Sequence, residues 1–388
     1  MPRSLSEGVS SFLAMDVLEK AQELERQGRH VIHLEIGQPD FPTPTFICEA
    51  AAKAARDGHT GYTHSLGLLP LREAIAAYYE REYGIAVSPE RIVVTNGSSP
   101  ALLLLFMALL RPGDSVLLPD PTYACYSNCI GVAGGTCAFL PTREQDGFQL
   151  KVNDIAARQA AAAAILINSP SNPAGTIIPA DDLKALCSLG VPVISDEIYH
   201  GLVYEGRAYS ALQFNADACV VDGFSKRYAM TGWRLGWMVL PERLVAPVQR
   251  MQQNFFICAG SAAQWAGIAA LEHGRPEVER MAAEYNRRRV VLLEGLRALG
   301  FGVSSAPVGA FYILANARHL GENSLALSFD ILEKAGVGCA PGVDFGSGGE
   351  GYLRFAYANS LEHIEEALHR LKLYLEQREV PSEQKKRL

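Results

Sequence analysis

Apolar residues recur along this chain with two different spacings. Near the N-terminus, Val17, Leu18, Ala21 and Leu24 fall on one helical face and Gly28 supplies a stop, so the pattern predicts an amphipathic helix. Farther along, short apolar runs alternate with segments of helical pattern. The runs are IVVT 92–95, SVLLP 115–119, TCAFL 136–140, AILIN 164–168, VPVIS 191–195, ACVVD 218–222 and LGWMVL 235–240. Such alternation predicts an α/β fold whose mainly parallel, seven-stranded sheet is covered by helices on both faces.

Several longer segments carry helical patterns. We expect helices over 45–57 and 70–82, over the alanine-rich run AARQAAAAA at 156–164, and over 275–298. The run ALLLLFMALL at 101–110 follows a turn and stops at a second turn, which favours a buried helix. These segments supply the helical layers that the predicted sheet requires.

The C-terminal part of the chain has a different pattern. GAFYILAN and GYLRFAYAN read as strands, and a final helix follows them. Four apolar residues share one face of that helix, namely Ile364, Leu368, Leu371 and Leu375. We therefore predict an N-terminal arm at 1–44, a large domain at 45–285 and a smaller α+β domain at 286–388. We expect the arm to pack with the small domain.

Composition excludes some classes of function. The 388 residues are 48% hydrophobic and 20% charged, with a formal net charge of −7, so we expect no nucleic-acid partner and no membrane association. The longest apolar run, 101–110, is about half a membrane span. The eight cysteines are scattered, and no histidine lies near the closest pair, Cys125 and Cys129. We expect no metal site, no signal peptide, reduced thiols and a cytoplasmic location.

Candidate chemistry follows the apolar runs, at the strand ends where such sheets bind ligands. The groups are a helix start at Gly97, Ser98 and Ser99, then Tyr123, Asn172, Asp196 with Tyr199, and Lys226. Each alone has an ordinary structural explanation, such as a capped helix, a buried aromatic ring, a rigid turn or a surface lysine. Together they offer a phosphate cradle, a flat ring, an acid, a phenol and an amine. Pyridoxal phosphate, held as a Schiff base on lysine, needs that set.

An ordered series of motifs makes this hypothesis specific. They are GQPDFPTP, GYTHSLGLLPLREAIA, VVTNGSSPAL, RPGDSVLLPDPTY, NSPSNPAGT, SDEIYHGLVY, GFSKRYAMTGWRLGW and GEGYLRFAYANS. Over essentially its whole length, the chain resembles the fold-type I pyridoxal-phosphate-dependent aminotransferases of the class I/II superfamily, in particular the bacterial aspartate/aromatic branch. The resemblance implies the pyridoxal-phosphate transferase fold and a ping-pong exchange of an amino group between an L-amino acid and a 2-oxo acid.

The resemblance assigns cofactor-binding and catalytic roles. Lys226 resembles the lysine that forms the Schiff base, Asp196 the acid that bonds the pyridine nitrogen, and Tyr199 a group that bonds the ring hydroxyl. As a free amine, Lys226 would serve as the general base, and burial beside Arg234 or Arg227 would favour its neutral form. Five residues resemble the phosphate cradle: Gly97, Ser98, Ser99, Ser225 and Arg234.

It also assigns roles to residues outside this group. Tyr123 resembles the aromatic side chain that stacks on the cofactor ring, and Asn172 a second partner of the ring hydroxyl. Gly37 and Arg354, together with Asn172, resemble contacts to the substrate and its α-carboxylate. Tyr62 resembles a tyrosine that reaches the phosphate in the neighbouring subunit. The resemblance therefore implies a homodimer whose active sites are shared.

The sequence departs from the family pattern at two places and leaves alternatives open. Pro100 stands where Gln or Glu is usual, and the block at 253–264 lacks the basic residue that some acidic-substrate relatives use. A β- or γ-lyase or a synthase on the same fold would have nearly the same cofactor residues. A sensing domain of a transcription regulator would need an additional DNA-binding domain, which we do not expect. The presence of Lys226, Asp196, Tyr199 and Arg354 argues against an inactive site.

Overall fold

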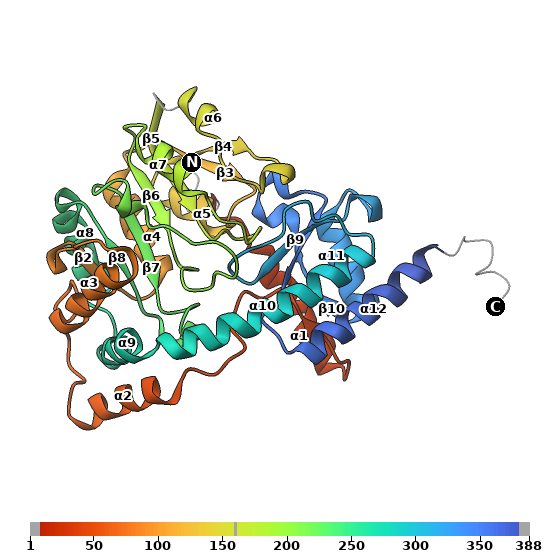
Figure 1. Cartoon of the computed structure of the whole chain (residues 1–388), viewed down its shortest axis with the longest axis horizontal. Helices are drawn as coiled ribbons and strands as arrows, with labels where there is room; N and C mark the ends of the chain where they lie inside the picture. Colours follow the sequence, from red (N-terminus) through yellow and green to blue (C-terminus); the bar gives the residue numbers. More distant parts are fainter. Residues whose placement is uncertain (1–7, 159–160, 380–388) are drawn as a thin grey trace, which may run out of the picture.

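The computed structural model describes residues 8–158 and 161–379 (Figure 1). Its main feature is a seven-stranded sheet with the strand order β2-β8-β7-β6-β5-β3-β4, in which only β8 runs antiparallel to its neighbours. The strands are β2 Ile92–Thr95, β3 Ser115–Asp120, β4 Thr136–Pro141, β5 Ala162–Asn168, β6 Val193–Asp196, β7 Cys219–Gly223 and β8 Gly236–Val239. The seven apolar runs therefore form the predicted sheet.

Helices cover both faces of this sheet because its strands are apolar on both faces. One face packs on α2 Thr45–Arg56, α3 Leu69–Tyr83, α7 Ala180–Cys187 and α9 Ser261–His273. The other packs on α4 Ser98–Leu109, α5 Cys125–Val132 and α8 Glu242–Phe255. Neighbouring strand residues alternate between these cores, as Ile165 and Leu166 do. The prediction of an α/β fold with two helical layers is confirmed.

The helix predicted for the alanine-rich run at 156–164 is wrong in the part of the run that the structure describes, and residues 159–160 lie outside the described residues. A short helix, α6 Val152–Ala156, ends where the run begins, and β5 starts at Ala162. Ala162 and Ala164 pair with β3, and Ile165 pairs with Val193 of β6. Alanine favours helices in isolation, but pairing with β3 outweighs that small intrinsic preference here.

The C-terminal region forms a second, smaller core. It contains the antiparallel sheet β11-β12-β9 and a two-stranded parallel pair, β1 with β10. The strands are β1 Ile32–His33, β9 Tyr312–Asn316, β10 Val337–Gly338, β11 Ala340–Pro341 and β12 Tyr352–Ala356. The helices are α10 Arg275–Ala298, α11 Ser324–Ala335 and α12 Leu361–Glu379, with a short 3-10 turn, η8 Gly342–Phe345. Ile364 and Leu371 of α12 are fully buried, as their spacing predicts.

The N-terminal arm packs against this C-terminal region. Helix α1 Leu13–Arg26 places Val17, Ala21 and Leu24 against Leu332 of α11, and β1 pairs with β10. In Figure 1, α10 runs as one continuous helix from the large sheet to this region, so the predicted boundary at residue 285 falls within a helix. The division into domains remains our proposal. Within the described residues, no helix is long and apolar enough to span a bilayer, and no cluster of side chains suits a metal ion.

Candidate active site

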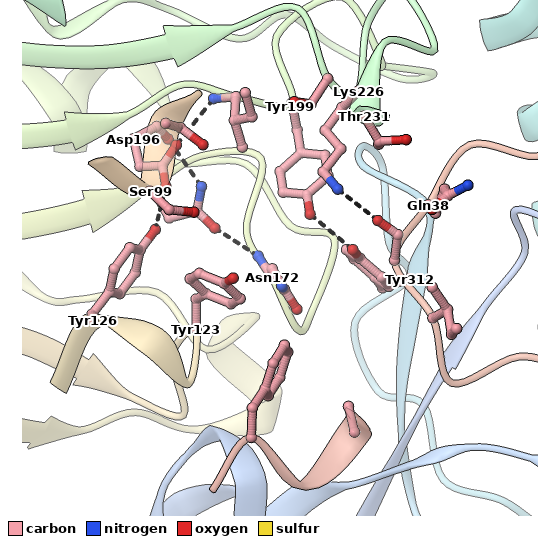
Figure 2. Close-up of a pocket in the computed structure, with 18 of the residues that line it drawn as sticks. Gln38, Ser99, Tyr123, Tyr126, Asn172, Asp196, Tyr199, Lys226, Thr231 and Tyr312 are labelled. Carbon is pink, nitrogen blue, oxygen red and sulfur yellow. Dashed lines mark hydrogen bonds between the residues drawn. The ribbon is translucent and has the colours of Figure 1, made fainter. Parts of the chain in front are cut away.

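Residues from the strand ends, the N-terminal arm and β12 meet around one cavity of about 250 Å³. Eleven of the thirteen predicted site residues line it, namely Gly37, Ser98, Ser99, Tyr123, Asn172, Asp196, Tyr199, Ser225, Lys226, Arg234 and Arg354. Figure 2 shows Lys226 and Tyr199 converging on Tyr312 and the segment that carries Gln38, with Asp196 near Tyr126 and Tyr123. The fold thus brings together residues that lie more than 300 positions apart, from Gly37 to Arg354.

Lys226 follows β7 and extends into the cavity. Its Nζ donates a hydrogen bond to the carbonyl oxygen of Gly37 at 2.6 Å. Burial, followed by repulsion from Arg354 and Arg234, lowers the pKa of Lys226 to about 8. Arg227 does not act as expected, because its Nε donates to the carbonyl of His200 and its Nη2 lies 3.6 Å from Asp222. The lysine amine is therefore poised to lose its proton near neutral pH.

Asp196 ends β6 and is 4% exposed. Its Oδ2 accepts a 2.6 Å hydrogen bond from the hydroxyl of Tyr126, and its Oδ1 accepts one from the backbone N–H of Ile198 at 3.2 Å. Burial raises the pKa of Asp196 to about 6, while these two hydrogen bonds and Lys226 act in the opposite direction. Two donors thus hold the carboxylate in a fixed orientation and favour its charged form.

Tyr199 shares a hydrogen bond with Tyr312 of β9, with 2.8 Å between the two hydroxyl oxygens. Burial raises the pKa of Tyr199 well above its ordinary value, so the phenol is neutral at physiological pH. Tyr312 also explains the glycine at position 37, because a Cβ there would lie 1.9 Å from the Tyr312 hydroxyl. Tyr312 therefore positions both a predicted catalytic group and the segment that contacts Lys226.

Arg354 of β12 is 2% exposed. Its Nη1 donates to Oδ1 of Asn172 at 3.0 Å, and its Nη2 donates to the carbonyl oxygen of Glu35. The guanidinium lies over the rings of Tyr312 and Phe345, at 4.4 and 4.9 Å from their centroids. No acidic side chain of the described residues pairs with it. A buried, well-oriented cation without an anionic partner suits a carboxylate ligand.

The predicted phosphate cradle lies at the start of α4. Gly97 is its N-cap with φ of +100°, a backbone conformation that favours glycine. A Cβ at Gly97 would lie 2.6 Å from Nη2 of Arg234, so the glycine lets the guanidinium approach the helix start. Ser98 and Ser99 open the helix and line the cavity, where their backbone N–H groups suit an anion. Gly97 is not among the residues that line the cavity, and it contributes by letting Arg234 approach the start of α4.

Tyr62 lies outside the cavity. Its side chain is 83% exposed, and the next residue, Thr63, donates its backbone N–H to Sγ of Cys258 at 3.4 Å. This placement leaves the predicted contact with a neighbouring subunit as a prediction.

Sequence reasoning missed several residues of the cavity. Phe12, Ala14 and Met15 of the N-terminal arm line it, as do Tyr126 and Tyr312. Tyr123 lies just before α5 and Tyr126 in its first turn, with 5.2 Å between the ring centroids, so the three-residue spacing could have marked Tyr126 as a neighbour of the same site. The other four come from segments that meet the site only through tertiary packing, so no local pattern indicates them.

Comparison with known proteins identifies the family. The chain matches the model of aminotransferase class I and II over residues 29–371, and it belongs to that family. The (5-formylfuran-3-yl)methyl phosphate transaminase of Methanocaldococcus jannaschii is 39% identical over 94% of this chain and 97% of its own. The valine–pyruvate aminotransferase of Mycobacterium tuberculosis is 38% identical over 96% and 98%. A structure of Thermus thermophilus aspartate aminotransferase with maleate has a TM-score of 0.92 at 35% identity, covering 96% of this chain and 99% of that one.

The protein is accordingly a pyridoxal-phosphate-dependent aminotransferase. This confirms the reaction class and the cofactor that the sequence predicted. These three relatives are aminotransferases rather than lyases, so the alternative of a lyase or synthase is not supported.

Proposed function

We propose that the cavity is the active site of this aminotransferase and that the residues predicted from the sequence hold the cofactor and substrate there. The observation that carries this proposal is the Lys226 amine, with its pKa lowered to about 8, in the same cavity as the buried carboxylate of Asp196. Among the described residues, Asp196 has no ion-pair partner of its own. A protonated ring nitrogen would supply the missing cation, and the helix start beside Arg234 would suit a phosphate.

Each residue then has a defined task. Pyridoxal phosphate, when bound, supplies an electrophilic carbon and a ring that takes up electrons. Arg354 binds the substrate α-carboxylate through two parallel hydrogen bonds and so fixes the orientation of Cα. Lys226, as the neutral amine, removes the proton from Cα and returns one in the reverse half-reaction. Asp196 would stabilise positive charge on the ring nitrogen, and Tyr199 would donate a hydrogen bond to the ring oxygen.

A reduction experiment tests the assignment of Lys226. Borohydride should fix the cofactor covalently to the wild-type chain, because the Schiff base becomes a stable secondary amine. Lys226→Ala should bind the cofactor but fail to retain it after reduction and unfolding, as measured by intact mass. Lys53→Ala, a change in an exposed lysine of α2, is the matched control and should retain it. Cofactor that remains attached to the Lys226→Ala chain would mean that another lysine forms the link.

The lining of the cavity supports an amino acid substrate with an uncharged side chain. The cationic residues around the cavity are Lys226, Arg234 and Arg354, and each already has a role in binding or catalysis. The remaining wall is mainly apolar and includes Phe12, Met15 and Leu102. Valine, leucine, phenylalanine, alanine and aspartate should be compared with pyruvate, 2-oxoglutarate and oxaloacetate as acceptors. A kcat/KM for aspartate above those of the apolar amino acids would refute this part.

The exposed apolar residues support a homodimer with shared sites. Tyr62, Phe255 and Ile257 are 83%, 55% and 45% exposed, and Met107 lines a shallow hollow together with Phe255. The Tyr62 loop contacts the segment after α8 through Thr63 and Cys258. Exposed apolar side chains on adjoining segments indicate an interface, and a second copy of the chain is the occupant that the Tyr62 resemblance implies.

All eight cysteines are free, which supports the proposed cytoplasmic location.

Complementation between inactive variants tests the shared site. If each site takes Lys226 from one chain and Tyr62 from the other, a mixed dimer of Lys226→Ala and Tyr62→Ala has one intact site. Refolding the two together should restore activity that neither shows alone. A mixture of Lys226→Ala with Arg354→Ala is the control, because both residues lie in one chain's cavity and no intact site can form. Confirmed mixed dimers without rescue in the first mixture would exclude sharing through Tyr62.

A further inference from the structure

One wall of the active-site cavity is the first turn of α1. Phe12, Ala14 and Met15 line the cavity there. The Phe12 ring meets the Tyr123 ring edge-on, with 6.1 Å between centroids, and Ala14 is 4% exposed in a small cluster with Phe345. This turn is one of the apolar parts of the cavity, together with Ile36, Leu102 and Ile198, and it can contact a substrate side chain.

The backbone of this turn is hydrogen-bonded to a residue near the other end of the chain. The N–H groups of Leu13 and Ala14 donate to the two carboxylate oxygens of Asp344, at 2.9 and 3.0 Å. Phe12, the N-cap residue, has no side chain that can accept these bonds. The negative charge of this carboxylate is also stabilised by the partial positive charge at the N-terminal end of the helix. Asp344 therefore caps α1 in place of a local residue.

The turn that carries Asp344 also supports the carboxylate-binding arginine. Asp344 lies in η8, and the next residue, Phe345, places its ring 4.9 Å from the Arg354 guanidinium. The backbone N–H of Val343 donates to Oγ of Ser324 at 3.1 Å, which attaches η8 to α11. One short turn thus connects the apolar wall to the group that binds the substrate α-carboxylate.

We propose that Asp344 is a positioning residue for side-chain selectivity, because it fixes the distance between the Phe12–Met15 wall and Arg354. This inference rests on the proposed function of the cavity. A large apolar side chain, with its carboxylate at Arg354, depends on the wall for contact, whereas the methyl group of alanine does not. Asp344 should therefore affect leucine and phenylalanine far more than alanine.

The test compares Asp344→Asn with Asp16→Asn. An amide oxygen can accept only one of the two N–H groups, and its own NH₂ faces the other donor. Among the described residues, Asp16, in the same first turn, accepts only from the Ser11 hydroxyl, so its variant controls for loss of a charge beside the helix. We expect Asp344→Asn to lower kcat/KM for leucine by about fivefold, the effect of losing one cap, and for alanine by less than about twofold. Asp16→Asn should leave both values and their ratio unchanged.

Hydrogen exchange gives a readout that does not depend on activity. In holoenzyme of Asp344→Asn, peptides covering α1 should exchange faster, while peptides covering α12 should not change. Phe12→Ala should reproduce the loss for leucine, and adding Asp344→Asn to it should cause little further loss, because both act through the same wall. If Asp344→Asn folds poorly, Phe12→Ala alone must still change the leucine-to-alanine ratio.

Three results would overturn the proposal. One is unchanged exchange in α1 with an unchanged leucine-to-alanine ratio. Another is an equal loss for all amino acids with faster exchange in α12, which would indicate general destabilisation. The third is a Phe12→Ala variant that keeps the wild-type ratio. Failure of the proposed function is distinguishable, because the wild-type protein would then transaminate none of these amino acids while the exchange data still report on the cap.

Discussion

The hydrogen bond from Tyr126 to Asp196 offers a direct test of how the site prepares its carboxylate. Tyr126 is fully buried, and its hydroxyl donates to Oδ2 of Asp196 at 2.6 Å. Tyr126→Phe removes that donor and little else, because the ring keeps its packing. In the variant, burial would still raise the pKa of Asp196. Only the backbone N–H of Ile198 and the charge of Lys226 would then lower it.

The size of the effect follows from the geometry. A hydrogen bond to a charged group contributes about 1.5–3 kcal/mol, and about 1.4 kcal/mol corresponds to one pH unit in a pKa. Tyr126→Phe should therefore raise the pKa of Asp196 from about 6 by about one to two pH units. In the variant, about half to nine-tenths of the Asp196 side chains would be neutral at pH 7 before the cofactor binds. A neutral acid cannot pair with a protonated ring nitrogen, so cofactor affinity should fall.

The dissociation constant of pyridoxal phosphate, measured by absorbance between pH 5 and 9, reports this change. In the wild type, affinity should fall as the pH decreases through the pKa of Asp196, and in Tyr126→Phe the fall should begin at a higher pH. The cofactor also titrates in this range, but identically for every variant. The difference between variants therefore reports only the titration of groups on the protein. Tyr79→Phe is the control, because Tyr79 is fully buried and its hydroxyl meets Trp237 rather than Asp196.

Two outcomes would refute the reasoning. If Tyr126→Phe and Tyr79→Phe have the same pH dependence as the wild type, the hydrogen bond does not control the charge of Asp196. If both variants shift alike, the effect comes from loss of a buried hydroxyl in general. A shift in Tyr126→Phe alone would show that the carboxylate is tuned by this donor.

Three further predictions concern other parts of the site and the arm. Arg354→Lys should raise KM for amino and oxo acids by about tenfold or more, because a point charge cannot make two parallel bonds; unchanged kinetics would contradict this. Gly97→Ala should weaken cofactor binding by about tenfold or more by displacing Arg234, whereas Gly113→Ala, with a similar φ but open space around it, should only destabilise the fold. The pKa of His33 is raised to about 9, first by its hydrogen bond to Glu35, so its stabilisation is complete below pH ~6.5 and lost as pH rises through about 9. The free energies of unfolding of the wild type and His33→Gln, measured in urea, should converge above that pH. A difference that is constant with pH would show that the charged His33–Glu35 pair does not contribute this stability.

The sequence predicted the large sheet because every strand of it lies in an apolar run. Strands buried on both faces leave a signal that does not depend on knowing their partners. Lys226 and Asp196 could be predicted to share a site because the carboxyl ends of parallel strands meet at one edge of a sheet. The prediction for the alanine run at 156–164 failed for the opposite reason, because alanine carries no periodic signal and the described alanines are placed by pairing with β3.

What the sequence could not predict are the supports of the site that come from distant segments. Tyr312 limits residue 37 to glycine, and Asp344 caps a helix 330 positions away, yet neither position stands out in the chain. Such contacts depend on the packing of the N-terminal arm against the C-terminal region. The reacting groups lie in motifs with a fixed local geometry, whereas the shape of the substrate pocket depends on packing between segments. Motif residues can therefore identify the reaction class, while the choice of substrate has to be argued from the residues that line the substrate pocket.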